Sequence, residues 1–144
     1  MFRLSLILMT VLSVAFASPA DAGLTKWFKQ KKQVITAKVQ RRDKARVGKD
    51  VHRLESILAS VKSSQKVSAK SWQSVAKEAD TLSIRILANV KSATSDKDPL
   101  RKAEQLRTHV QNMKKEALNG DYKKTRQHAE RALSVATKLD EWAG

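Results

Sequence analysis

Residues 98–122, DPLRKAEQLRTHVQNMKKEALNGDY, contain the clearest helix signals in this 144-residue chain. Asp98 followed by Pro99 is typical of a helix start, because the carboxylate caps free backbone N–H groups and proline fits the first helical position. Gly120 is typical of a residue that follows a helix end. We therefore predict a helix that ends at Leu118. Apolar residues recur along it every three or four positions, as on one helix face: Ala103, Leu106, Val110, Met113 and Ala117.

The segment after Gly120 predicts a second helix packed against the first. Asp121 is a candidate N-cap, and small residues follow it at helical spacing. A connection this short makes the two helices antiparallel, and the alanines let them approach closely. The expected inward positions are Tyr122, Ala129, Ala132, Ala136, Leu139 and Ala143.

Two more apolar stripes precede this pair of helices. Ser68 is a candidate N-cap, with Val67 packing on Trp72 as a hydrophobic staple. Gly48 either ends a helix, with Asp50 capping the next one, or lies inside a longer helix at a cost of about 1 kcal/mol. The chain therefore predicts an all-α fold, an antiparallel up-down bundle of four helices, or five if Gly48 breaks the first. The two stripes are Val51, Leu54, Ile57, Leu58 and Val61, then Trp72, Val75, Ala79, Leu82, Ile86, Val90 and Ala93, with Ala76 and Leu87 beside the second and Ile84 outside it.

The first residues differ in character from the rest. A positively charged N-terminus is followed by an almost unbroken apolar run from Leu4 to Ala17. Ala20-Asp21-Ala22 then places small residues at the positions that a signal peptidase recognises before its cleavage site. The run is too short to span a bilayer as a helix, which takes about 20 residues. We therefore expect an exported protein, periplasmic or secreted. Its expected parts are a cleaved signal peptide over 1–22, a basic amphipathic helix over 23–48 and a helical bundle over 49–144.

The residue composition excludes several kinds of catalytic and cofactor site. The chain has no cysteine, which excludes disulfides, thiolate metal sites and haem attachment through paired thiols. No glycine-rich phosphate loop occurs, and no carboxylate pair is fixed by the pattern. We therefore expect a protein that is not an enzyme and uses no cofactor.

The positive charge is concentrated near the start of the expected mature chain. The formal net charge is +15, and the segment from Lys26 to Arg53 holds 11 Lys or Arg against Asp43 and Asp50. One interpretation of this charge is a solvated basic face. The other is a binding surface for a polyanion or an anionic membrane, and the clustering of the basic residues favours this second interpretation. Export makes nucleic acid a less favoured partner than lipid headgroups or an envelope polymer. The candidate anion-binding residues are Lys26, Lys29, Lys32, Lys38, Arg41, Arg42 and Arg46.

Apolar residues accompany these cations at helical spacing, as in helices that lie in a membrane interface. Trp27 and Phe28 are the candidate membrane anchor, either exposed for that role or buried in the bundle. The opening KWFKQKK, residues 26–32, resembles the start of cecropin-type cationic peptides. The stripe comprises Leu24, Trp27, Phe28, Val34, Ile35 and Val39, interrupted by Lys31 and Lys38.

Asn119-Gly120-Asp121-Tyr122, followed by spaced alanines, is similar to half of a tetratricopeptide repeat, although no second copy occurs at the 34-residue period. This resemblance implies a structural protein–protein interaction module as an alternative function. Self-association of the bundle through Ile84, giving a homo-oligomer, is a related alternative.

A weak metal-binding bundle is the remaining alternative. The short turn places His109 and His128 at heights that differ by about 3 Å on facing flanks of two antiparallel helices. Small exported histidine-rich metal-binding proteins have similar bundles, but this chain has three histidines, and His52 is remote from the pair in sequence. A stable site needs three or four ligands, so ordinary flank histidines are the expected outcome.

Overall fold

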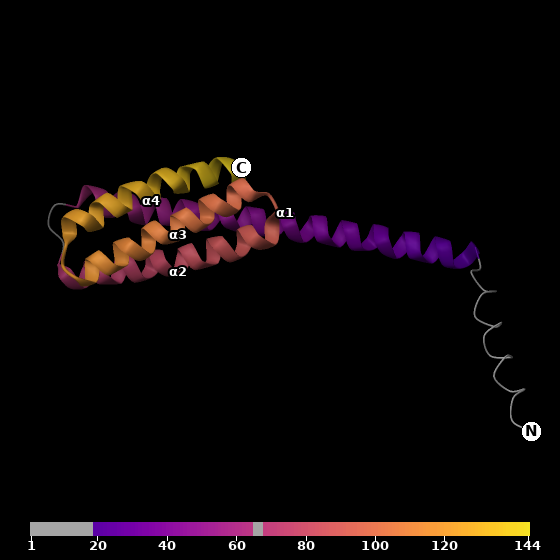
Figure 1. The fold of residues 1–144 in the computed structure, drawn as a ribbon, viewed down its shortest axis with the longest axis horizontal. Coiled ribbons are helices and arrows are strands. Elements are labelled where there is room, and N and C mark those ends of the chain that lie inside the picture. The colour runs from indigo at the N-terminus through magenta and orange to yellow at the C-terminus, as the bar shows by residue number, and fades with distance from the viewer. Residues whose placement is uncertain (1–18, 65–67) are drawn as a thin grey trace, which may run out of the picture. The chain divides into compact units, whose positions relative to one another are not determined.

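The computed structural model describes residues 19–64 and 68–144, which form four α-helices and no strand. The predicted all-α class is confirmed. Most of the expected signal peptide, residues 1–18, lies outside the described residues, as does the Val67 staple. The chain divides into two compact units, Met1–Ala37 and Lys38–Gly144. The helices are α1 (Pro19–Ser63), α2 (Ala69–Ala93), α3 (Lys97–Leu118) and α4 (Tyr122–Ala143), labelled in Figure 1.

Gly48 does not end a helix. It lies inside α1, so the five-helix alternative is wrong, and Asp50 is not an N-cap but a buried side chain bound by Arg85 at 2.7 Å. One glycine within a helix lowers its stability only slightly, and the free energy gained by the full burial of Val47 and Val51, on either side of Gly48, offsets this loss. A Cβ at Gly48 would lie 3.6 Å from the Cβ of Ala143, so this is where α1 and α4 approach closely.

Of the other three expected N-caps, two are confirmed. The side chains of Ser68 and Asp121 accept hydrogen bonds from backbone N–H groups of the first turns of α2 and α4. The prediction that Asp98 caps α3 is wrong, because Asp96 accepts from the Asp98 N–H at 3.1 Å and the helix begins at Lys97, two residues before the predicted first position, Pro99. Pro99 then occupies the third helical position, where its missing N–H is one that the helix would leave unpaired in any case.

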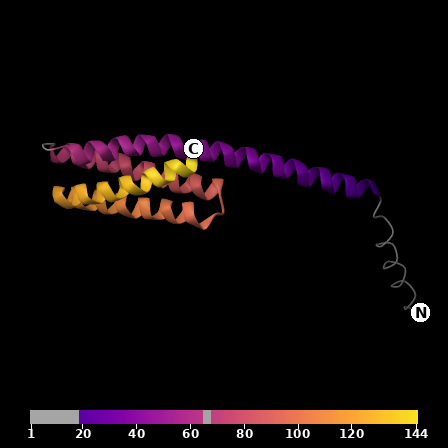
Figure 2. The same ribbon diagram turned by 90° about the horizontal axis from the view of Figure 1, so that it is seen from above.

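Polar contacts show how α1 pairs with its neighbours within the Lys38–Gly144 unit. Residue numbers rise along α1 while they fall along the partner helix, as in antiparallel pairs. Helix α3 packs against both α2 and α4, and Figures 1 and 2 show these helices side by side. The contacts with α2 join Asp43 to Ser92, Asp50 to Arg85 and Arg53 to Glu78; those with α4 join His52 to Asp140, Thr137 to Glu55 and Lys62 to Glu130.

The core of this unit follows the predicted stripes closely. All five predicted positions of α3 are buried, and so are four of the five in α1, with Ile57 partly exposed. Ser83 and Thr125 are buried polar residues outside the prediction. Each donates its hydroxyl hydrogen to a carbonyl oxygen of a residue three or four positions earlier, at 2.8 Å in both cases, which removes most of the cost of burial. The other buried apolar residues are Trp72, Ala76, Ala79, Leu82, Ile86, Leu87 and Val90 in α2 and Ala129, Ala132, Ala136 and Leu139 in α4, whereas Val75, Ala93, Tyr122 and Ala143 are partly exposed.

Candidate functional site

The side chains of the Met1–Ala37 unit are all exposed from residue 23 onward. Trp27 is 47% exposed and Phe28 is 62% exposed. The two rings meet edge to face, with centroids 5.0 Å apart and planes at 77°, the arrangement that aromatic quadrupoles favour. The sequence left open whether this pair is buried, and the structure places it in solvent.

Lys31 interrupts the apolar stripe in the sequence but belongs to it in three dimensions. Its ammonium lies over the Trp27 ring, 4.2 Å from the centroid, as in a cation–π contact. The aliphatic stem of a lysine in this position covers apolar surface while its charge remains in water. One face therefore combines exposed apolar groups with a positive charge. The other exposed apolar residues of the unit include Leu24, Val34 and Ile35.

The heptad register of this stripe differs from the register that fills the bundle core. Counting in sevens from Phe28 and Ile35 leads to Arg42 and Lys49, which are both exposed. The buried apolar positions of α1 are instead Val47, Val51, Leu54, Leu58 and Val61. The stripe before residue 40 therefore does not continue the sequence pattern that buries α1.

Most of the candidate anion-binding cations have no ion-pair partner among the side chains that the structure describes. The 20 residues from 23 to 42 include seven Lys or Arg and no acidic residue. Arg46 pairs with Asp43 at 3.5 Å, which weakens its candidacy. Among the side chains that the structure describes, those of residues 23–64 and 68–144, the remaining six make no ion pair: Lys26, Lys29, Lys32, Lys38, Arg41 and Arg42.

The two histidines of the α3–α4 hairpin lie together. The ring centroids of His109 and His128 are 6.4 Å apart, and the Nδ1 atoms of both are buried without a hydrogen-bond partner among the described residues. Burial lowers the pKa of His109 below its ordinary value, and the charges of His128 and Arg131 lower it further. No third metal-ligating side chain joins them in the part of the chain that the structure describes, so the pair does not form a three-ligand metal site there.

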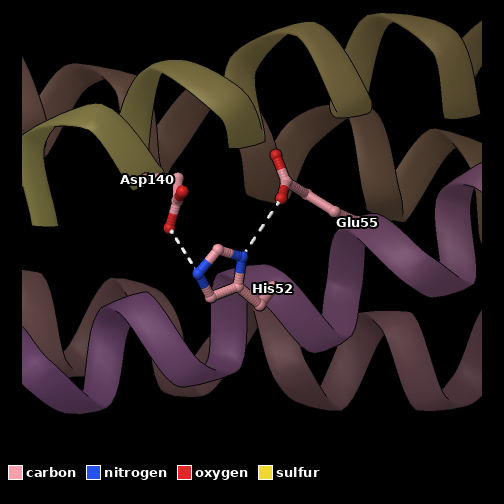
Figure 3. Close-up of side chains that lie close together, drawn as sticks. All are labelled: His52, Glu55 and Asp140. Atoms are coloured by element: carbon pink, nitrogen blue, oxygen red, sulfur yellow. Dashed lines mark ion pairs between the residues drawn. The ribbon is translucent and has the colours of Figure 1, made fainter. Parts of the chain in front are cut away.

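His52 has partners that the sequence did not reveal. Its Nδ1 lies 3.6 Å from Oε2 of Glu55, one turn along α1, and its Nε2 lies 3.4 Å from Oδ1 of Asp140 on α4. Figure 3 shows the imidazole between the two carboxylates. The spacing of His52 and Glu55 places both on one helix face and was visible in the sequence. Asp140 was not predictable, because no short turn fixes the register of α1 against α4.

Comparisons with protein-family models, with curated proteins and with solved structures found no match for this chain. Over the described ranges, no helix is both long and apolar enough to cross a membrane.

Proposed function

We propose that this chain is an exported helical binding protein whose basic N-terminal helical segment attaches to an anionic membrane surface. In this proposal, residues 1–22 are a cleaved leader, and an antiparallel up-down four-helix bundle within residues 38–144 is the stable scaffold. The observation that carries the proposal is the exposure of Trp27 and Phe28 among cations that make no ion pair with the described side chains. An anchor needs this exposure, whereas an ordinary bundle helix would bury the two rings.

The expected energetics combine two terms of different range. Each lysine close to an anionic leaflet contributes about 1 kcal/mol, and this attraction decays over a Debye length of about 8 Å at physiological salt. The aromatic rings act only on contact, since apolar area contributes about 25 cal/mol per Å² removed from water. Cations therefore bring the segment to the surface, and the aromatic pair retains it there.

Vesicle sedimentation tests the proposal. The protein should sediment with phosphatidylglycerol vesicles but not with phosphatidylcholine vesicles, and added salt should release it. The double variant Lys29→Glu and Lys32→Glu should bind at least tenfold more weakly; the pair Arg41→Glu and Arg42→Glu should weaken binding in the same direction.

A matched control separates a local surface from net charge alone. Lys77 and Lys138 are exposed on α2 and α4 and make no ion pair among the described residues. Reversing both with glutamate changes the net charge by the same amount as the Lys29 and Lys32 pair. Equal loss of binding in the two double variants, or equal binding of the unmodified protein to both vesicle types, contradicts the proposal.

Self-association is a second candidate function, supported by the exposure of Ile84 on α2. Size-exclusion chromatography with light scattering at high salt distinguishes it, because a stable oligomer under those conditions favours this alternative. The tetratricopeptide-like interpretation has less support. The Tyr122 ring packs on Trp72 of α2, with centroids 5.6 Å apart, so it already contacts another helix of the same chain.

A further inference from the structure

We infer that His52, Glu55 and Asp140 form a binding site for a divalent transition-metal ion of the Zn²⁺ class. The three side chains come from α1 and α4 within the Lys38–Gly144 unit, and one ligand atom from each lies within 4.8 Å of the others. This inference is independent of the proposed membrane attachment, which uses other residues.

One ligand atom from each side chain lies within 4.8 Å of the others, a spacing that must shorten when the three bind one metal ion. Zn²⁺ binds imidazole nitrogen and carboxylate oxygen at about 2.0–2.2 Å, so donors around a tetrahedral ion are roughly 3.4 Å apart. The two contacts of His52 with the carboxylates measure 3.4 and 3.6 Å. The two carboxylates face different nitrogens of the ring, as Figure 3 shows. A rotation of the His52 side chain, which is 69% exposed, would direct one nitrogen toward a shared ion.

A neighbouring hydroxyl group orients one of the ligands. Thr137 donates its hydroxyl hydrogen to Oε1 of Glu55 at 2.9 Å, which leaves Oε2 directed at His52. Hydrogen bonds of this kind to a ligating carboxylate fix its orientation in metal sites. The carboxylates are also less exposed than the histidine, with side-chain exposures of 22% for Glu55 and 30% for Asp140. Helix packing therefore holds the two oxygen ligands, and the exposed imidazole adjusts to them.

The donor set selects the class of ion. One imidazole nitrogen with two carboxylate oxygens suits Zn²⁺ and its first-row neighbours, while soft Cu(I) prefers sulfur and Ca²⁺ takes six to eight oxygens. Three protein ligands leave the fourth position to water.

Metal binding should stabilise the bundle, because the ligands come from two helices and are not held together in the unfolded chain. The test uses the protein without an affinity tag, in a non-chelating buffer at pH 7.5, with ZnCl₂ as the probe. Isothermal titration calorimetry should give one ion per chain. At a free zinc concentration tenfold above the dissociation constant, the folding equilibrium constant should rise about 11-fold. For a domain of this size, that corresponds to a rise in Tm of roughly 5 °C.

The variants His52→Gln and Asp140→Asn should each abolish the zinc-dependent rise in Tm while retaining the helical circular dichroism signal. The matched control is the double variant His109→Gln and His128→Gln, which removes the other histidines and should leave the zinc response unchanged. Zinc stabilisation that persists in His52→Gln, or that disappears in the control, overturns the assignment. So does the absence of zinc binding by the unmodified protein at millimolar metal.

Discussion

Replacing both Trp27 and Phe28 with alanine should weaken attachment to anionic vesicles by a predictable factor. An aromatic side chain can bury about 150–250 Å², and these two are 47% and 62% exposed. About 200 Å² therefore remains available for contact with lipid, which at 25 cal/mol per Å² corresponds to about 5 kcal/mol for complete coverage. A helix lying in the interface covers roughly half of that area. The expected loss is thus about 2–3 kcal/mol, or roughly 30- to 150-fold in affinity.

The assay is titration of phosphatidylglycerol vesicles at several salt concentrations, with the Lys29→Glu and Lys32→Glu variant measured in parallel. Loss of the rings should reduce affinity at every salt concentration by a similar factor, because apolar burial is not screened. Loss of the cations should instead flatten the salt dependence. The Tm of the aromatic variant should match that of the unmodified protein, because both side chains are exposed. An aromatic variant with unchanged affinity, or one that unfolds at lower temperature, refutes the reasoning.

Three predictions concern the stability of the bundle. Gly48→Ala should raise the unfolding free energy in urea by about 1 kcal/mol, because alanine favours the helix and its methyl group would meet an α4 side chain at an ordinary 3.6 Å; a destabilised variant would mean that α1 and α4 pack more tightly there. Asp96→Ala should lower the free energy of unfolding by about 1 kcal/mol, because it removes the N-cap of α3, and Asp98→Ala should lower it less. A larger loss in Asp98→Ala would instead support Asp98 as the N-cap, as the sequence predicted. The lowered pKa of His109 means that the folded state favours the neutral ring, so its contribution to stability is complete above the ordinary value of 6.5 and declines as pH falls below it. Substitution of His109 and His128 with glutamine should flatten that part of the pH profile in urea titrations, and an unchanged profile would assign the acid sensitivity to other groups.

Local signals allowed the sequence to predict most of the bundle. Regular spacing identified the buried face of α3, and Gly120, with a φ of 75°, ends the helix where a left-handed residue was expected. The predicted start of α3 is two residues late, because Asp96 and Asp98 carry the same capping group and the proline after Asp98 favoured the second. Ser83 and Thr125 were not predicted to lie in the core, because a hydropathy pattern does not reveal the hydrogen bonds from their hydroxyl groups to the helix backbone.

The two histidine clusters show the limit of this reasoning. A short turn joins α3 to α4, so the register of His109 against His128 follows from counting residues, and the rings indeed lie 6.4 Å apart. No such turn joins α1 to α4. The side chain that meets His52 depends on how four helices pack together, and Asp140 could be found only in the structure.

Basic residues serve two different roles in this chain, and the difference explains why a partner is expected at one of them. In the Lys38–Gly144 unit, Arg85 and Lys114 bind acids on a neighbouring helix, at 2.7 Å from Asp50 and 2.6 Å from Asp80. Such cations join helices, and their charge is largely compensated. The cations from residue 26 to 32 lie in a stretch, residues 23–42, that contains no acidic residue, and the exposed rings beside them lie outside the heptad register of the core. Exposed aromatic area without a folding role, together with uncompensated charge, is the combination that binding to a lipid interface uses.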